Sequence, residues 1–480
     1  MSLSIDPDIS VLSFLTHIYL EPFTPPLPLI FCLIGAAATI VITFALAGVF
    51  SGKSQLSLKA ESFRLGVSDW KTAKVLSSRS TLNGFRFISV FIFILIIYAC
   101  FRGNSNPIYN IAPTFVWVIW WVGLAYLSAF VGDLWRLINP WHSLFHWGEQ
   151  LFLAWNPSRS IKPLFKYPKR IGATPALIIF FAFAWTENVY HDSVVPIRIG
   201  QMIIIYSAIT WSGMMMFGRE IWLRNGEAFT VAFGFLAKFS PVEVRHDSIP
   251  TSNIAQKEIN LRFPGSGLIE IGLISTSQML FVLLLLSAVT FDGLMGTMIW
   301  MRVQNAVTEY IPNILVVGSL GLIIVSVVFA GFYLCFCFLM KSVSGENYGT
   351  FIFANNFVTS LIPIALAYHV AHFLLFLLVQ GQLMIPLISD PFGHGWDLFG
   401  TANYRINFRV MSPTFFWIIS VSSIVIGHVV AVVVSHFIAM RMIRNRYKAF
   451  KSQYPMLVLM IFYTIASLWI ITQPMYQSSM

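Results

Sequence analysis

The stretch NILVVGSLGLIIVSVVFAGFYLCFCFLM, residues 313–340, decides the fold of this chain. It runs for 28 residues without a charged side chain, and a membrane-spanning helix needs about 20 apolar residues. Nine further apolar runs lie at 27–49, 87–101, 112–132, 174–190, 199–217, 267–291, 352–379, 414–440 and 456–473. The sequence therefore predicts an all-α, polytopic transmembrane bundle of about ten spans, organised as a single integral membrane domain over residues 1–480.

The composition excludes a soluble protein. Of 480 residues, 57% are hydrophobic and only 10% are charged, whereas soluble domains carry roughly 25% charged residues. The mean hydropathy is +0.75. The net charge of +10 is what basic cytoplasmic loops produce in a membrane protein. The composition therefore predicts a lipid bilayer as the partner, and no nucleic acid.

The basic residues also predict an orientation. Connections on one side of the predicted bundle carry 25 of the 30 Lys and Arg residues, and those on the other side carry five. Because cytoplasmic loops are enriched in Lys and Arg, both termini are expected outside the cytoplasm. Residues 1–25 contain no Lys or Arg, so we expect no cleaved signal peptide.

Two segments have the composition of amphipathic helices at a membrane surface. Residues 134–153 combine three tryptophans with charged side chains and are broken at Pro140. Residues 219–239 have a charged first half and then an apolar run too short to span. Both are expected to lie along the cytoplasmic face or to dip into it.

Ionisable side chains gather near the predicted outer ends of the spans and in the outer loop at 380–413. These residues are Glu187, His191, Asp192, Asp292, His369, His372, Asp390, His394 and Asp397. Ionisable residues within a bilayer are energetically costly and commonly functional. This group is therefore the first candidate for a site.

A divalent metal ion fits part of this group. His369 and His372 are three residues apart on one predicted helix, so both rings can reach one ion. His428 is a candidate third ligand, while Asp390 and Asp397 are candidate ligands or catalytic general bases. A bound metal ion would activate water for hydrolysis of an apolar ester. Interhelical hydrogen bonding is the alternative use of these histidines.

A second histidine pair, His142 and His146, suggests the histidine boxes of membrane di-iron enzymes. The predicted topology argues against this interpretation, because these residues lie on the cytoplasmic side and His369 lies towards the outside.

Several long segments are similar to bacterial polytopic membrane proteins of the fenitrothion hydrolase family. They are VGDLWRLINPW at 131–141, FGREIWLRNGEAFTVAFGFLAKFSPVE at 217–243, AYHVAHF at 367–373, SDPFGHGWDLFG at 389–400 and GHVVAVVVSHFIAMR at 427–441. The resemblance implies hydrolysis of a lipophilic organophosphate triester with release of a nitrophenol. It also implies a bacterial protein, so the multi-pass bundle is expected in the inner membrane, and the orientation predicted from the basic residues then places both termini in the periplasm. It does not supply residue roles.

Two functions without catalysis compete with this hydrolase hypothesis. A transporter, or a membrane protein that handles metal ions or lipids, would use the same residues to bind and release its cargo. A scaffold subunit would use its many Trp and Phe side chains to pack against a membrane partner. The sequence alone leaves these alternatives open.

Overall fold

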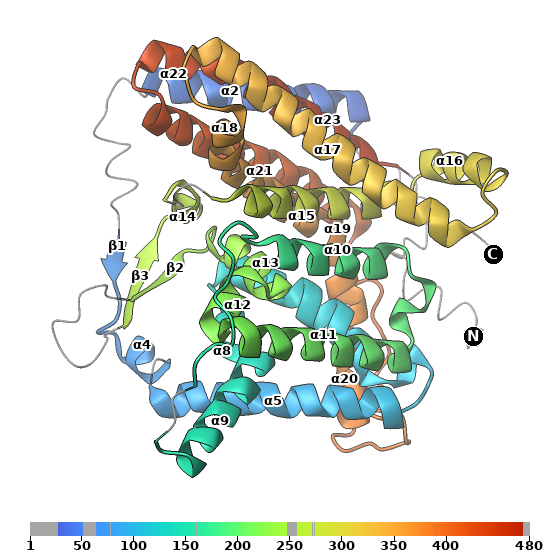
Figure 1. Cartoon of the computed structure of the whole chain (residues 1–480). Helices are drawn as coiled ribbons and strands as arrows, with labels where there is room; N and C mark the ends of the chain where they lie inside the picture. The colour runs from blue at the N-terminus through green and yellow to red at the C-terminus, as the bar shows by residue number, and fades with distance from the viewer. Residues whose placement is uncertain are drawn as a thin grey trace.

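The computed structural model describes residues 27–50, 64–76, 78–158, 161–246, 257–270, 272 and 274–473. In this part of the chain, nine helices are long and apolar enough to cross a membrane. They are α2 (Leu29–Phe50), α5 (Arg79–Arg102), α6–η2–α7 (Ile111–Phe130), α11 (Pro196–Phe217), α15 (Thr276–Met295), α17 (Ile314–Ser344), α18 to α20 (Thr350–Ser389), α21 (Pro413–Met442) and α22–α23 (Arg446–Ile471). The predicted all-α polytopic bundle is confirmed (Figure 1).

The tenth predicted span, 174–190, corresponds to α10 (Thr174–Asn188). This helix has 15 residues, which extend over about 22 Å at 1.5 Å per residue. It is therefore shorter than the hydrocarbon core of a bilayer, which is about 30 Å thick. It packs against α15 and α13 (Ala228–Ala237).

Local capping sets where two spans begin. The predicted run at 267–291 starts earlier than α15, because Ser275 caps this helix and forms a capping box with Gln278. The run at 87–101 starts later than α5, because Ser78 caps α5 ahead of two arginines. Hydropathy locates the apolar core of a span, whereas the hydrogen bonds of the cap set its first residue.

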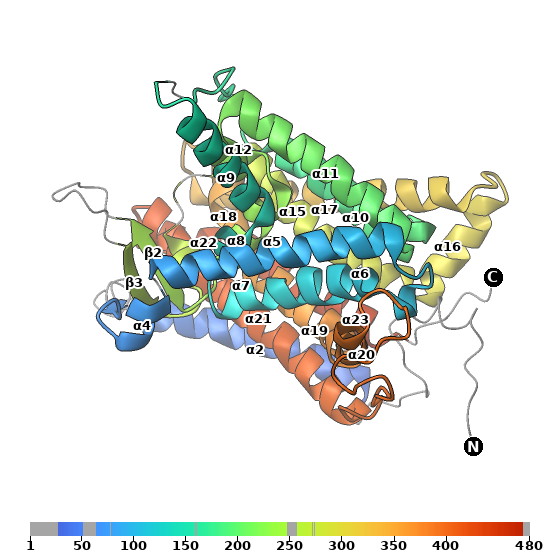
Figure 2. The same cartoon turned by 90° about the horizontal axis from the view of Figure 1, so that it is seen from below.

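A small sheet marks one end of the bundle, which we call the sheet end (Figures 1 and 2). It consists of β1 (Arg64–Gly66), β3 (Lys257–Arg262) and β2 (Val242–His246), with β3 in the centre and both pairings antiparallel. The register places Leu65 opposite Leu261 and Val244 opposite Ile259. The opposite end carries α16 (Met298–Thr308), and we call it the α16 end. The remaining short elements are α4 (Lys71–Leu76), η1 (Pro107–Tyr109), η3 (His191–Val194) and α14 (Ser266–Ile269).

Arg262 fastens the sheet to the helices. Its side chain is buried, and its Nη2 atom donates to the carbonyl oxygens of Ala237 and Lys238, each at 3.0 Å. These carbonyls belong to the last turn and C-cap of α13, where intrahelical donors are missing. Its Nη1 atom lies 3.3 Å from Glu243 in β2. Arg262 therefore supplies hydrogen-bond donors both to the carbonyl groups at the end of α13 and to a carboxylate of the sheet.

The two predicted surface segments have different positions. Residues 134–153 form α8 (Trp135–Ile138) and α9 (Pro140–Trp155), which are separated at Asn139 as the proline predicts. Residues 219–239 form α12 (Arg219–Asn225) and α13. Eight of the ten residues of α13 are buried, and the helix packs against α7 (Leu124–Phe130), α10 and α19 (Ile362–Gln380). The second segment thus dips into the bundle.

Candidate functional site

The two histidines of α19 face different neighbours. His369 and His372 are both buried, at 7% and 6% exposure. The Nε2 atom of His372 lies 2.9 Å from Oδ2 of Asp292 on α15. The ring of His369 instead packs edge-on against Trp121 and Tyr126, with ring centroids 6.0 Å and 5.3 Å apart. The predicted spacing is thus present, but the two rings meet different helices.

Glu187 connects α10 to this region. It lies in the last turn of α10, and Trp121 donates its indole N–H to Glu187 Oε1 at 2.6 Å. Trp121 belongs to η2 (Thr114–Gly123), a π-helical segment of ten residues. Because the indole of Trp121 contacts both Glu187 and His369, it links the carboxylate to the imidazole.

Tyr368 brings a hydroxyl to the same place. A Cβ atom built on Gly293 would lie 2.3 Å from Oη of Tyr368, so this hydroxyl lies against the helix turn that carries Asp292. We define the polar cluster as Trp121, Glu187, Asp292, Tyr368, His369 and His372. Four elements, η2, α10, α15 and α19, contribute to it. Four of its members are predicted from the sequence, whereas Trp121 and Tyr368 are not, because their residue types are common in membrane cores.

The polar cluster is only partly hydrogen-bonded. Within the described part of the chain, neither ring nitrogen of His369 has a hydrogen-bond partner, and Tyr368 Oη also has none. Buried polar groups are nearly always paired, so each exception calls for an explanation. The polar cluster therefore offers a free imidazole and a free hydroxyl close to two carboxylates.

His428 lies on the neighbouring helix α21, as the predicted hairpin requires. Gly427 packs on Pro363 and Ala367 of α19, which lie before His369 in that helix. The Nδ1 atom of His428 is 2.8 Å from the carbonyl oxygen of Ile424, and its Nε2 atom is buried without a partner in the described residues. Among those residues, no group of three or more His, Cys, Asp or Glu side chains is arranged to hold a metal ion.

Asp390 and Asp397 lie in the loop after α20 (Met384–Ser389). The carboxylate of Asp390 accepts backbone N–H bonds from His394, Gly395 and Trp396 at 3.0, 2.7 and 3.1 Å. Partial burial acts to raise the pKa of Asp390, but these backbone bonds outweigh it and lower the pKa below its ordinary value. Asp397 accepts bonds from Ser389 and Ala402 at 3.1 and 3.0 Å. Both carboxylates organise their own loop.

The histidines of the di-iron alternative lie at the sheet end on α9. The Nδ1 atom of His146 is 2.6 Å from Nη1 of Arg219, which also pairs with Glu149. Burial, and next the charge of Arg219, lower the pKa of His142 to about 4. A fixed guanidinium in this position repels a metal cation, so the surroundings are unlike those of an iron site.

A second buried carboxylate, Glu227, was not selected from the sequence. It caps α13 and is fully buried. It accepts the backbone N–H groups of Phe229 and Thr230, the side-chain N–H groups of Trp135 and Asn139, and the hydroxyls of Tyr206 and Thr230. We call this arrangement the Glu227 network. The signal that could have found it is a lone carboxylate directly before an apolar run.

No protein-family model matches the chain. Comparison with curated proteins and with solved structures gave no match either. The resemblance to fenitrothion hydrolases stays a prediction that rests on the sequence segments alone.

Proposed function

We propose that this protein is a membrane transporter in which the polar cluster takes up and releases a cation. The observation that carries the proposal is His369, a buried imidazole with no hydrogen-bond partner in the described residues. It lies beside the indole that binds Glu187, and its helix neighbour His372 pairs with Asp292. Ionisable groups placed this way inside transmembrane bundles serve proton relays and ion pathways.

The arrangement of the helices supports this proposal. Glu187 and Trp121 come from the first half of the chain, while Asp292, His369 and His372 come from the second half. Sites between two sets of helices are typical of transporters, because relative movement of the sets opens the site to either side. Two carboxylates beside two imidazoles can change their number of bound protons. When the carboxylates are deprotonated, a bound proton or metal cation balances their negative charge.

We further propose that the protein resides in the bacterial inner membrane, with the sheet end in the cytoplasm and both termini in the periplasm. The support is the concentration of Lys and Arg in the connections on one side of the predicted bundle. The exposed apolar side chains of α2, α5 and α17 are the surfaces expected to contact lipid.

Metal-assisted hydrolysis of a lipophilic organophosphate triester is the second candidate. The observation that favours it is the contact between His372 and Asp292, because metal-binding histidines commonly donate their other N–H to a carboxylate. His369 and His428 have unpartnered ring nitrogens that would hold the ion. A divalent metal ion would supply an activated water there.

One set of measurements on purified protein in liposomes separates these functions. Proton influx is followed with a trapped pH dye, and zinc influx with a trapped fluorescent indicator, each under an imposed membrane potential. Turnover of a nitrophenyl phosphotriester is followed by the colour of released nitrophenol. The variants are Asp292→Asn and His369→Phe. His436→Gln is the matched control, since this buried histidine bonds Gln453 outside the polar cluster.

A transporter gives potential-dependent proton or zinc influx, which we expect to fall at least about tenfold in both cluster variants and to persist in the control. Triester turnover without either flux would contradict transport and support the hydrolase. Absence of flux and turnover in folded protein that retains a defined membrane partner would contradict both functions and support a scaffold subunit.

A further inference from the structure

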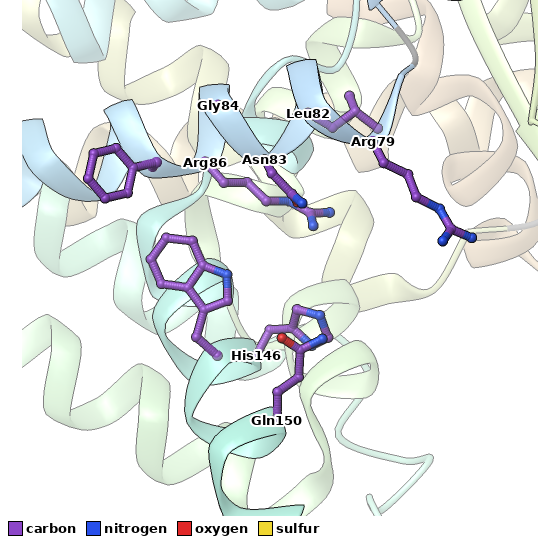
Figure 3. Close-up of a pocket in the computed structure, with 9 residues that line it drawn as sticks. Arg79, Leu82, Asn83, Gly84, Arg86, His146 and Gln150 are labelled. Atoms are coloured by element: carbon purple, nitrogen blue, oxygen red, sulfur yellow. The ribbon is translucent and has the colours of Figure 1, made fainter. Parts of the chain in front are cut away.

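A pocket of about 640 Å³ lies at the sheet end between the first turns of α5 and the middle of α9. Arg79 and Arg86 line it from α5, and His146 lines it from α9 (Figure 3). Trp147 of α9 also lines it. The pocket belongs to neither the polar cluster nor the Glu227 network. Its chemistry therefore needs its own explanation.

The pocket is basic and offers unused donors. No carboxylate is among the described residues that line it. The Nε atom of Arg86 is buried and has no hydrogen-bond partner in the described part of the chain. The nearby Glu149 is already bound to Arg219. A lining with two arginines and no carboxylate suits a phosphate, which accepts the N–H bonds of arginine.

The surroundings of the pocket are apolar and face outward. Phe87 lines the pocket and is 65% exposed. It begins a stripe along α5 that continues through Phe91, Ile94 and Tyr98, which are 58%, 57% and 52% exposed. Residues spaced by three and four lie on one helix face. A ligand whose phosphate lies between the arginines can thus lay apolar chains along α5.

A second apolar stripe leaves the pocket along α9. Trp147 lines the pocket, and Leu151 and Trp155 follow at intervals of four residues, with 60% and 81% exposure. An exposed apolar stripe on a helix that also carries charged side chains is typical of the membrane–water interface. Such a pair of helices would place the basic pocket at the depth where lipid headgroups are found.

We propose that this pocket binds the phosphate headgroup of an anionic phospholipid, with Arg79 and Arg86 on the phosphate and the acyl chains along the exposed face of α5. Clusters of Lys and Arg beside the end of a transmembrane helix or on an amphipathic helix recognise anionic headgroups in this way. The proposal is independent of the transport proposal, because none of its residues belongs to the polar cluster.

The test counts lipids bound to the whole protein by native mass spectrometry. Purified protein in detergent is titrated with dioleoyl phosphatidylglycerol or with dioleoyl phosphatidylcholine. The double variant Arg79→Gln/Arg86→Gln should bind phosphatidylglycerol about 25-fold more weakly, at about fivefold per arginine. The matched control Arg224→Gln/Arg444→Gln removes two exposed arginines elsewhere and should bind it as the unchanged protein does.

A second variant adds a side chain at the edge of the pocket without changing its charge. A Cβ atom on Gly84, which lines the pocket, meets no atom within 4 Å. Gly84→Leu therefore projects into open space, and leucine favours the helix more than glycine does. We expect at least about a tenfold loss of phosphatidylglycerol binding from this variant. It decides the question if the double arginine variant fails to fold.

Equal binding of phosphatidylglycerol and phosphatidylcholine would overturn the proposal, and so would unchanged binding in Gly84→Leu. Inorganic phosphate and glycerol 3-phosphate serve as competitors. If either displaces phosphatidylglycerol at equal concentration, the pocket takes a free phosphate from solution, and the assignment to lipid is wrong.

Discussion

The Glu227 network and the polar cluster are two buried groups of ionisable side chains with opposite degrees of hydrogen bonding. Glu227 accepts bonds from two backbone N–H groups and four side chains. In the described residues, His369 has no bond to either ring nitrogen. A fully satisfied network holds one structure, whereas a buried group without a partner is costly unless something else binds it. The comparison therefore distinguishes a structural carboxylate from a candidate site.

Substitution of Glu227 should have the largest effect on stability. Glu227→Ala leaves the donors of Trp135, Asn139 and Tyr206 buried without an acceptor, so we expect a loss of roughly 3–5 kcal/mol in the free energy of unfolding. The measurement is unfolding in mixed micelles with increasing sodium dodecyl sulfate. Glu220→Ala is the control, because this side chain is 68% exposed. If Glu227→Ala lowers the free energy of unfolding no more than Glu220→Ala does, Glu227 is not a structural carboxylate.

The pH dependence of stability extends the comparison to a third ionisable group, the half-buried His142. Burial, and next Arg219, lower its pKa to about 4, whereas the unfolded chain titrates near 6.5. The unfolded state therefore binds the proton more tightly. The stabilising contribution is complete above about pH 6.5 and is lost as the pH falls towards 4.

From pH 7 to pH 4.5 this contribution should fall by about 2 kcal/mol. His142→Phe should flatten that part of the dependence, as measured by unfolding in mixed micelles at each pH. His191→Phe, at an exposed position, should keep the original slope. Identical slopes in the two variants would show that His142 is not responsible.

A comparison of Asp390 with Glu227 separates two effects on stability, that of burial and that of the number of hydrogen-bond donors. Like Glu227, it accepts several backbone N–H bonds, but it lies in the loop after α20 and is only partly buried. Asp390→Ala should cost only about 1 kcal/mol, because water replaces the lost acceptor. Ion flux in liposomes should change less than about twofold, while abolished phosphotriester turnover would support the catalytic role predicted from the sequence.

His369→Phe should have the smallest effect on stability and a large effect on function. Phenylalanine keeps a ring against Trp121 and Tyr126 and removes two unsatisfied nitrogens, so the free energy of unfolding should change by less than about 0.5 kcal/mol. Flux should nevertheless fall at least about tenfold. His436→Phe should show the reverse pattern, because it loses the bond to Gln453. A strongly destabilised His369→Phe would mean that the imidazole is structural.

The sequence predicts the spans well, because hydrophobic length alone determines what crosses a bilayer. The predicted run at 313–340 corresponds to α17, and the run at 414–440 corresponds to α21. The sheet was not predicted. Its strands have three, five and six residues, and β1 pairs with a strand almost 200 positions away in sequence. Such pairings depend on tertiary structure rather than on local pattern.

The candidate site was predicted only in part, because the pairing of its side chains also depends on tertiary structure. Ionisable residues within apolar runs are conspicuous, so Glu187, Asp292, His369 and His372 were selected from the sequence. Which of them pair depends on how the helices face one another. Spacing alone suggested that the two histidines of α19 share one ion, whereas packing directs His372 to Asp292 and His369 to Trp121.

The hydrogen-bond register of the π-helical segment η2 sets the position of Trp121 in the polar cluster. In a π-helix each N–H bonds the carbonyl five residues back, whereas the α-helix uses the carbonyl four residues back. Rewinding Thr114–Gly123 by one such step would rotate the tryptophans of η2 around the axis and carry the indole of Trp121 away from Glu187. The hydrogen bond from the Trp121 indole to Glu187 therefore ties the π-helical register of this segment to the position of one carboxylate.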